Sequence, residues 1–129
     1  MDDGRLIYES RWARGMHLRS TDFIGRKVLV EIDRPVGSRH PTHGFLYPVN
    51  YGFVPGTLEP DGEALDAYAL GISGPMKQFE GLCIAVIHRL NDDEDKLVLS
   101  SAGKAFTDDQ IRDLTDFQER FFQSVILRG

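Results

Sequence analysis

The sequence predicts a mainly β (α+β) domain, in which a small closed barrel carries an amphipathic helix at its C-terminal end. Between residues 27 and 100, several short segments rich in β-branched and aromatic residues alternate with turns that contain glycine, proline or acidic residues. The hydrophobic period then changes to that of a helix. The chain has 129 residues, which is enough for one domain with one core.

Residues 1–22 differ from the rest, because they carry many charges and only a weak hydrophobic pattern. We expect an N-terminal extension that is loosely ordered or forms a short helix around Leu6–Met16, followed by a single domain over residues 23–129. The N-terminus has no apolar signal-peptide core, and no apolar stretch approaches the roughly 20 residues of a membrane-spanning helix. These features favour a cytoplasmic location.

The first clear element is the alternating segment KVLVEID at residues 27–33. It places Val28, Val30 and Ile32 on one face, which predicts a strand with one buried side. The next segment, RPVGSRHPTHG, holds two prolines and two glycines and is typical of a loop. FLYPVNYGFV then predicts one or two short strands around Pro48, and PGTLEPDGE has turn composition.

Three further strands are predicted from DAYALGI, LCIAVIHRL and KLVLS, the last two joined by an acidic hairpin turn, NDDED. Cys83 is the only cysteine and lies inside an apolar run, so we interpret it as core packing rather than as a nucleophile.

Residues 105–126 predict one amphipathic helix that begins at a capping box formed by Thr107 and Gln110. Asp108 and Asp109 suit the positive end of the helix dipole. The apolar face of this helix would consist of Ile111, Leu114, Phe117, Phe121, Phe122 and Val125.

The net charge and the absence of several motifs exclude some classes of function. The net charge is −5 and there is no long basic run, which argues against a general nucleic-acid binder. The chain has no G-x-S-x-G elbow, no P-loop and no G-x-G-x-x-G. The candidates that remain are clusters of carboxylates.

The first acidic cluster is DGEALD, with Asp61, Glu63 and Asp66 within six positions. If Gly62 closes the turn and Asp66 begins the next strand, the three carboxylates could face one point, where a hard divalent cation would relieve their repulsion. Spacing alone favours the alternative, a solvated acidic turn.

The second acidic cluster is the predicted hairpin tip. If the two acidic turns meet at one barrel mouth, they could hold two or more metal ions on a phosphate substrate; otherwise this tip is a solvated turn. The cluster contains Asp92, Asp93, Glu94, Asp95 and Lys96.

The loop segment RHPTHG contributes Arg39, His40 and His43. These side chains could reach a phosphate or a metal ion, or could be ordinary surface residues.

The segment YPVNYGFVPGTLEPDGEALDAYAL, residues 47–70, resembles the core of the soluble, metal-dependent family I inorganic pyrophosphatases. VEI at residues 30–32 and EDKL at residues 94–97 resemble two further segments of that family, so the similarity covers about residues 25–125. The resemblance implies a five-stranded OB-like barrel and Mg²⁺-dependent hydrolysis of pyrophosphate to two phosphates, with Mn²⁺ as a substitute ion. It also suggests a homo-oligomer, and the sequence as a whole gives no support for a nucleic-acid or membrane partner.

The resemblance assigns roles to the acidic residues. Asp61 and Asp66 would bind activating metal ions, with Asp66 as the bridging ligand near the attacking water, and Glu63 would orient or deprotonate that water. The remaining metal ligands would be Glu31, acting through water, Asp92, and one of Glu94 and Asp95.

The resemblance also implies a set of phosphate contacts. Tyr51 would contact phosphate or a metal-bound water, Tyr47 would line the same wall, and Lys96 would bind a phosphate oxygen. The segment RPVGSRHPTHG replaces a longer, phosphate-gripping loop of the family, and Arg34, Arg39, His40 and His43 could substitute for it, although no motif of the family assigns them that role.

The chain departs from the family pattern at Glu63, where the family has Asp, and at Ala64, where it has Pro. Phe121 and Phe122 align with a Tyr-Lys pair that contacts phosphate. Each lost charged contact is worth about 1.5–3 kcal/mol. Two alternatives therefore stand beside pyrophosphate hydrolysis: hydrolysis of another small phosphoanhydride, and a non-catalytic OB-like binding module.

Overall fold

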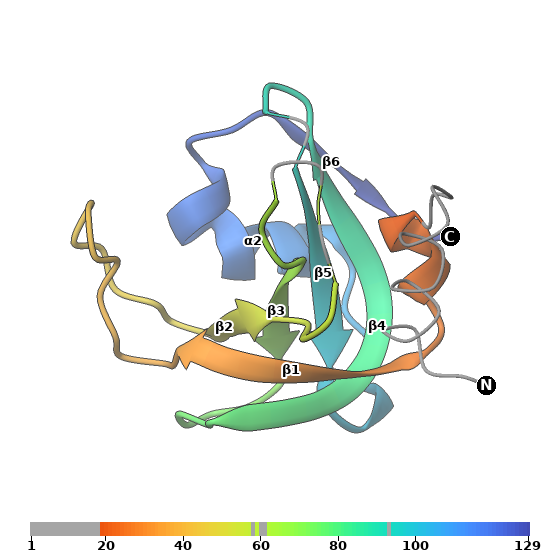
Figure 1. The fold of residues 1–129 in the computed structure, drawn as a ribbon, viewed down its shortest axis with the longest axis horizontal. Helices are drawn as coiled ribbons and strands as arrows, with labels where there is room; N and C mark the ends of the chain where they lie inside the picture. Colours follow the sequence, from red (N-terminus) through yellow and green to blue (C-terminus); the bar gives the residue numbers. More distant parts are fainter. Residues whose placement is uncertain (1–18, 58, 60–61, 93) are drawn as a thin grey trace.

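Five strands close into a ring in the computed structural model, which describes residues 19–57, 59, 62–92 and 94–129 (Figure 1). The ring order is β1-β2-β3-β5-β4, and β4 pairs again with β1. The β3–β5 pair is parallel and the other pairs are antiparallel. The predicted closed barrel of five strands is thereby confirmed. Its strands are β1 (Lys27–Arg34), β2 (Asn50–Phe53), β3 (Asp66–Leu70), β4 (Gln78–Arg89) and β5 (Asp95–Ser100).

The long, curved strand β4 closes the barrel (Figure 1). Its first half pairs with β1, where Leu82 lies opposite Lys27, and its second half pairs with β5, where Ile87 lies opposite Lys96. The register with β5 shifts between Cys83 and Ala85. Such a bulge bends a strand and increases its twist, which lets one strand serve two neighbours.

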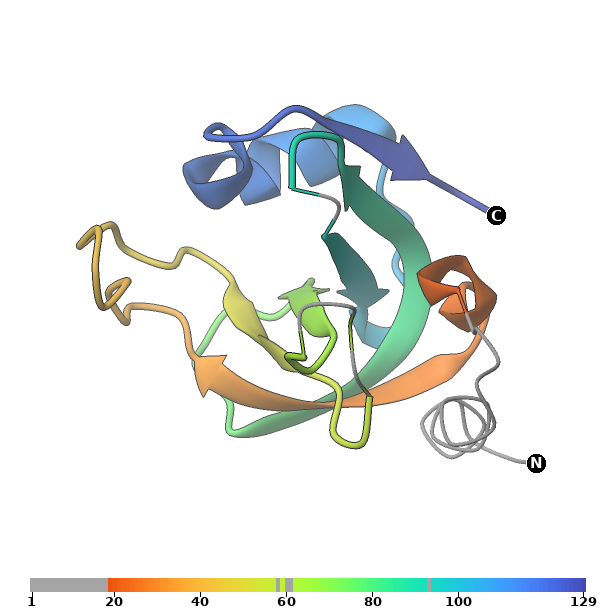
Figure 2. The ribbon, with the colours of Figure 1, turned by 45° about the horizontal axis from the view of Figure 1, so that its top comes forward.

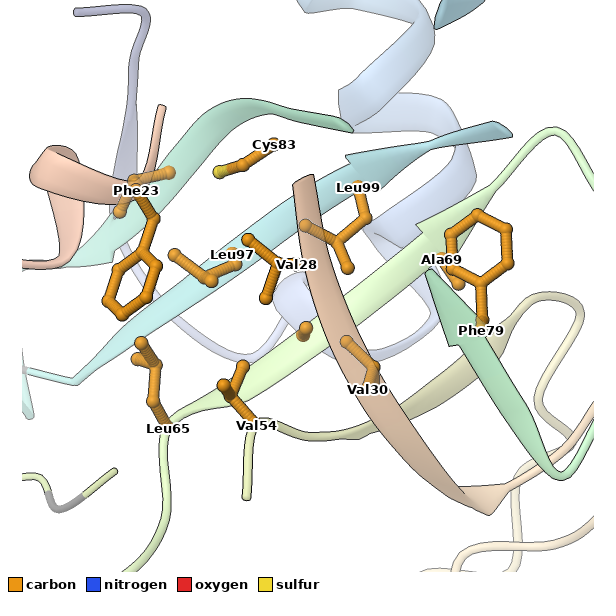
Figure 3. Close-up of a cluster of buried hydrophobic side chains, with 12 residues drawn as sticks. Phe23, Val28, Val30, Val54, Leu65, Ala69, Phe79, Cys83, Leu97 and Leu99 are labelled. Atoms are coloured by element: carbon orange, nitrogen blue, oxygen red, sulfur yellow. The ribbon is translucent and has the colours of Figure 1, made fainter. Parts of the chain in front are cut away.

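The barrel interior is filled by alternate residues of the strands, which Figure 3 shows as a cluster. Val28 and Val30 of β1 meet Leu97 and Leu99 of β5 in this cluster. Cys83 is part of it, so its interpretation as a core residue is confirmed. Burial raises the pKa of Cys83 to about 12, so the thiol is neutral near pH 7.

Helix α2 (Asp108–Glu119) packs on the outer face of the barrel (Figure 2). Ile111 of the helix shares a second buried cluster with Tyr68 of β3 and Val98 of β5. Both faces of β3 and β5 are therefore covered, and this accounts for their almost continuous apolar sequences.

The predicted C-terminal helix begins where the sequence indicates but ends earlier than predicted. Thr107 and Gln110 form the predicted capping box. The helix, however, ends at Glu119, and the chain then turns into β6 (Ser124–Leu127), which pairs antiparallel with β4. The segment S-V-I-L suits a strand, and the free edge of β4 supplies hydrogen-bond partners that outweigh the helical hydrophobic period. Phe121, Phe122 and Val125 therefore do not belong to the helix.

Two short 3₁₀ turns complete the described chain, η1 (Ser20–Phe23) and η2 (Ser101–Gly103). Phe23 reaches into the barrel core. The helix expected around Leu6–Met16 lies outside the described residues, and the boundary at residue 23 stays a prediction. Within the described ranges, no helix has both the length and the apolar character needed to span a membrane.

Only glycine fits at position 52, in the N-Y-G-F segment, because two backbones approach each other closely there. Gly52 of β2 lies opposite Ile32 of β1. A Cβ atom added at Gly52 would lie 1.8 Å from the carbonyl oxygen of Glu31. Because the obstacle is backbone, no side-chain movement can relieve this overlap.

We expect Gly52→Ala to lower the free energy of unfolding by about 3 kcal/mol, the upper end of overpacking costs, since β1 and β2 must separate to admit the methyl group. Urea unfolding followed by circular dichroism measures this change. Gly74→Ala is the control, because a Cβ there meets nothing within 4 Å. Equal midpoints for the two variants would contradict the close approach.

Candidate active site

The centre of the site is a contact between β3 and β5, where Asp66 lies opposite Lys96 in the parallel register. The Lys96 ammonium donates to Asp66 Oδ2 at 2.7 Å and to Glu94 Oε1 at 2.7 Å. The Tyr51 hydroxyl donates to the same Asp66 oxygen at 2.8 Å. A residue from each of the two acidic segments thus meets at one lysine.

A second contact joins the same two turns, because the backbone N–H of Asp95 donates to Glu59 Oε2 at 3.3 Å. Glu59 precedes the first acidic cluster in the sequence, and Asp95 belongs to the second. The two acidic turns, whose meeting the sequence left open, are therefore in contact in the fold.

Burial and charge set the protonation states of Tyr51 and Lys96 at this centre. Burial raises the pKa of Tyr51 far above its ordinary value, so Tyr51 is a neutral donor. Burial alone would lower the pKa of Lys96, but its ion pair with Asp66 helps to raise that pKa overall. Lys96 is therefore a cation that holds two carboxylates, and Tyr51 orients Asp66 rather than acting as a base.

This centre opens into a cavity of about 390 Å³. Its cations are Arg34, Arg89 and Lys96. The cavity is also lined by carboxylates, whose hard oxygen atoms are the ligands that Mg²⁺ and Mn²⁺ prefer, so the chemistry of the lining fits such an ion. Five of the described carboxylates line the cavity: Asp33, Glu59, Glu63, Asp66 and Glu94.

The described side chains do not by themselves form a finished ligand set, since no three of their acidic, histidine or cysteine groups gather closely enough for one ion. Asp61, which the sequence analysis assigned to the metal site, lies outside the described residues.

A buried ion pair supports one wall of the cavity, which Arg89 lines. Arg89, at the end of β4, is 5% exposed and donates to both oxygens of Glu119, at 3.0 and 2.9 Å. The Tyr68 hydroxyl donates to the same carboxylate at 2.6 Å. Burial opposes the charge on Arg89, yet the hydrogen bonds to Glu119 raise the pKa of Arg89 overall. Arg89 also reaches Asp92 at 3.2 Å, so it ties α2 to the acidic hairpin.

Hydrogen bonds continue from this pair to the loop after β1. Gln118 Nε2 donates to the Tyr68 hydroxyl at 2.7 Å, and the Tyr47 hydroxyl donates to Gln118 Oε1 at 2.7 Å. Arg34 then donates to the Tyr47 hydroxyl at 2.9 Å. Helix α2 is in this way connected to both sides of the cavity, and Arg34 is held at its rim.

The predicted site residues that the structure describes fall into two groups: some are held by other partners away from the cavity lining, and the rest line the cavity. Glu31 is held by Gln78 at 2.5 Å, and Arg39 donates to the carbonyl oxygen of Gly44 at 2.9 Å. Asp95 contacts His88 and Ser20. Asp92 contacts Arg89, and Tyr47 is buried behind the wall. The predicted residues that line the cavity are Tyr51, Glu63, Asp66, Glu94, Lys96, His40 and His43.

The sequence analysis missed several residues of the cavity and its wall. A signal existed for two of them: Gln118 and Glu119 lie seven and eight positions after Ile111, on the buried face of the helix, where polar residues need partners. Arg89 ends an apolar strand, which is also unusual for a charge. The missed residues are Asp33, Glu59, Arg89, Gln118 and Glu119.

Comparisons with known proteins point to one family. The sequence profile described as "Inorganic pyrophosphatase" matches residues 26–126. The inorganic pyrophosphatase of Saccharolobus solfataricus is 27% identical over 70% of this chain and 51% of its own length. Soluble inorganic pyrophosphatase 2 of Chlamydomonas reinhardtii is 38% identical over 65% of this chain and 50% of its own. The chain therefore spans about half the length of these two curated relatives.

Solved structures show the same fold. The inorganic pyrophosphatase of Ehrlichia chaffeensis superposes with a TM-score of 0.62 at 16% identity, covering 78% of this chain and 84% of that one. The inorganic pyrophosphatase of Neisseria gonorrhoeae gives a TM-score of 0.54 at 25% identity, covering 76% and 73%.

We expect Glu119→Gln to lower the free energy of unfolding by about 3 kcal/mol, because the amide leaves the buried Arg89 charge without its main partner. Urea midpoints measure the loss.

Asp116→Asn, one turn earlier on α2, is the matched control, since its pair with Arg120 has both side chains more than half exposed and should be worth no more than about 0.5 kcal/mol. Equal midpoints would mean that Asp92 and Glu94 balance Arg89 without Glu119.

Proposed function

Because the chain belongs to the inorganic pyrophosphatase family, we propose that it hydrolyses inorganic pyrophosphate to two phosphates with Mg²⁺ as its cofactor. The observation that carries the proposal is the contact of Asp66 with Lys96 and Tyr51 in a cavity lined by carboxylates. A cavity with this lining repels a polyanion unless cations enter with it, so a metal–phosphate complex is the ligand that fits.

Mg²⁺, or Mn²⁺ in its place, would be held by carboxylates of the two acidic turns. Asp66, Glu63 and Glu94 line the cavity, and Asp61 belongs to the same turn as Glu63. Glu31, Asp92 and Asp95 remain the other proposed ligands. When bound, the ion neutralises phosphate charge, polarises the phosphoryl group and lowers the pKa of bound water.

The residues around the ion have separate roles in the proposal. Among the described residues, Lys96 donates to Asp66 and Glu94, and its third donor can meet a phosphate oxygen. Tyr51 fixes the orientation of Asp66 by its hydrogen bond. Glu63, at the cavity wall, accepts a proton from the attacking water.

The reaction balances with water as the co-reactant. The water oxygen forms a bond to one phosphorus, and the bridging P–O bond breaks. One water proton goes to Glu63 and from there to the solvent, the other stays on the newly formed phosphate, and the leaving phosphate takes up a proton from the solvent. Arg34 lies at the rim of the same cavity and donates hydrogen bonds to phosphate oxygens. The proposed phosphate contacts are completed by three residues of the loop that follows β1: Arg39, His40 and His43. The cytoplasmic location and the homo-oligomer stay predictions.

Asp66→Asn is expected to lower the rate of phosphate release from pyrophosphate by about 100-fold, because an amide is a poor metal ligand and cannot balance Lys96. The release of phosphate is measured in Mg²⁺, in Mn²⁺ and in EDTA, and EDTA should abolish it in the unmodified protein.

Asp116→Asn, on the exposed side of α2, should keep full activity. Turnover that survives either EDTA or the Asp66 substitution would contradict the proposal.

A further inference from the structure

The cavity has a second end, where Phe45, Phe121 and Phe122 have no role in the proposed phosphate chemistry. Its lining there is aromatic, contributed by the loop after β1 and by the residues that follow α2. In Figure 2 this loop extends on the same side of the molecule as the C-terminal end of the helix. The lining residues at this end are His40, His43, Phe45, Phe121 and Phe122.

The aromatic rings form a row that leads toward the phosphate end. The Phe121 and Phe45 rings lie 6.0 Å apart, with an angle of 21° between their planes. Phe45 is 5.7 Å from Tyr47, and Tyr47 is 5.6 Å from Tyr51, between ring centroids. Tyr51 then contacts Asp66 through its hydroxyl. A row of packed rings, in which Tyr47 is buried behind the cavity lining, therefore connects the two ends of the cavity.

The two phenylalanines after the helix differ in what holds them. Phe122 is covered by the guanidinium of Arg89, which lies 3.7 Å from its ring centroid, so it has a structural partner. Phe121 is 61% exposed, and it stacks at 6.4 Å on His43 as well as on Phe45. An exposed aromatic ring at a cavity rim gains little from folding and offers a face to a ligand.

The histidines of the loop present ring faces, His40 stacked on His43 and His43 on Phe121. The backbone N–H groups of Thr42 and His43 both donate to His40 Nδ1, at 3.1 and 3.0 Å, so the neutral ring carries its proton on Nε2. Loss of solvation lowers the pKa of His40, and the neighbouring charges of His43 and Arg34 lower it further. His40 therefore gives this end a flat ring and one N–H donor.

We propose that this aromatic end binds the base of a nucleoside polyphosphate, whose phosphate chain extends along the wall to Asp66 and Lys96. The phosphate end of this inference rests on the proposed function. The binding of the base at the aromatic end is argued only from the row of ring contacts and does not depend on the proposed hydrolysis. The cavity of about 390 Å³ lies within the range of roughly 300–1,000 Å³ that small-molecule ligands occupy, which leaves room beyond two phosphoryl groups.

A nucleotide is the occupant that uses both ends. A purely apolar ligand would leave Lys96 and the carboxylates unused, and inorganic phosphates would leave the exposed Phe121 face unused. Stacking also tolerates any base, since every base has a π face. The reaction would be the one already described: water adds to a phosphorus, the bridging P–O bond breaks, and the nucleotide leaves one phosphate shorter beside free phosphate.

The test compares two anions that differ by the nucleoside. Calorimetry in Mg²⁺ measures the affinity of the full chain for the β,γ-imido analogue of ATP and for imidodiphosphate. We expect the nucleotide to bind at least tenfold more tightly, which corresponds to about 1.4 kcal/mol. Phe121→Ala should remove most of that advantage, and Phe121→Trp should keep it.

Leu90→Ala is the matched control, because Leu90 is also exposed and apolar but does not line the cavity. In parallel, phosphate release from ATP and from inorganic tripolyphosphate should show a KM for ATP that rises about tenfold in Phe121→Ala, with the KM for tripolyphosphate unchanged.

The outcomes separate this inference from the proposed function. Equal affinity for the two analogues, or a nucleotide affinity that Phe121→Ala leaves unchanged, overturns the inference even if pyrophosphate is hydrolysed. A nucleotide preference that depends on Phe121 supports it, even if neither pyrophosphate nor ATP is turned over; in that case the proposed hydrolysis fails.

Discussion

The parallel register of β3 and β5 is the constraint on which the site depends. It sets Asp66 opposite Lys96, and a slip of one residue would turn one of them to the other face of the sheet. Parallel strands cannot be joined by a tight turn, so β4 must cross between them, and its hairpin to β5 delivers Glu94 to the same lysine. The crowding of like charges in the sequence is thereby balanced in the fold, first by Lys96 and then by the cations that we propose.

The second requirement is that the outer wall of the cavity stays in place. Packing a helix through a buried ion pair carries a large desolvation penalty, because both charges lose their water. Here the pair of Arg89 and Glu119 gains a hydrogen bond from Tyr68 and extends through Asp92 to the acidic hairpin. We infer that its value lies in geometry: it sets where α2 ends relative to the acidic carboxylates, which an apolar contact would fix less sharply.

The sequence was sufficient where local patterns decide the structure. Alternation identified β1, and a capping box located the start of α2. Asp66 and Lys96 came from motif spacing and family resemblance, but their contact depends on strand order, which no local pattern contains. Arg89 and Glu119 were missed because each is unusual alone and is explained only by the other, 30 positions away.

The error at the C-terminus and the aromatic end of the cavity have one cause. A helix continued to residue 126 would have packed Phe121 on its buried face, as its hydrophobic period suggests. Because α2 stops at Glu119 and β6 pairs with the edge of β4, the intervening turn releases Phe121 to the cavity rim, while Phe122 stays under Arg89. The turn is anchored on both sides, by the ion pair before it and by the strand after it, so the exposed ring has a defined position. A large apolar side chain held in place beside a phosphate-binding centre is suited to recognise a ligand with an aromatic group.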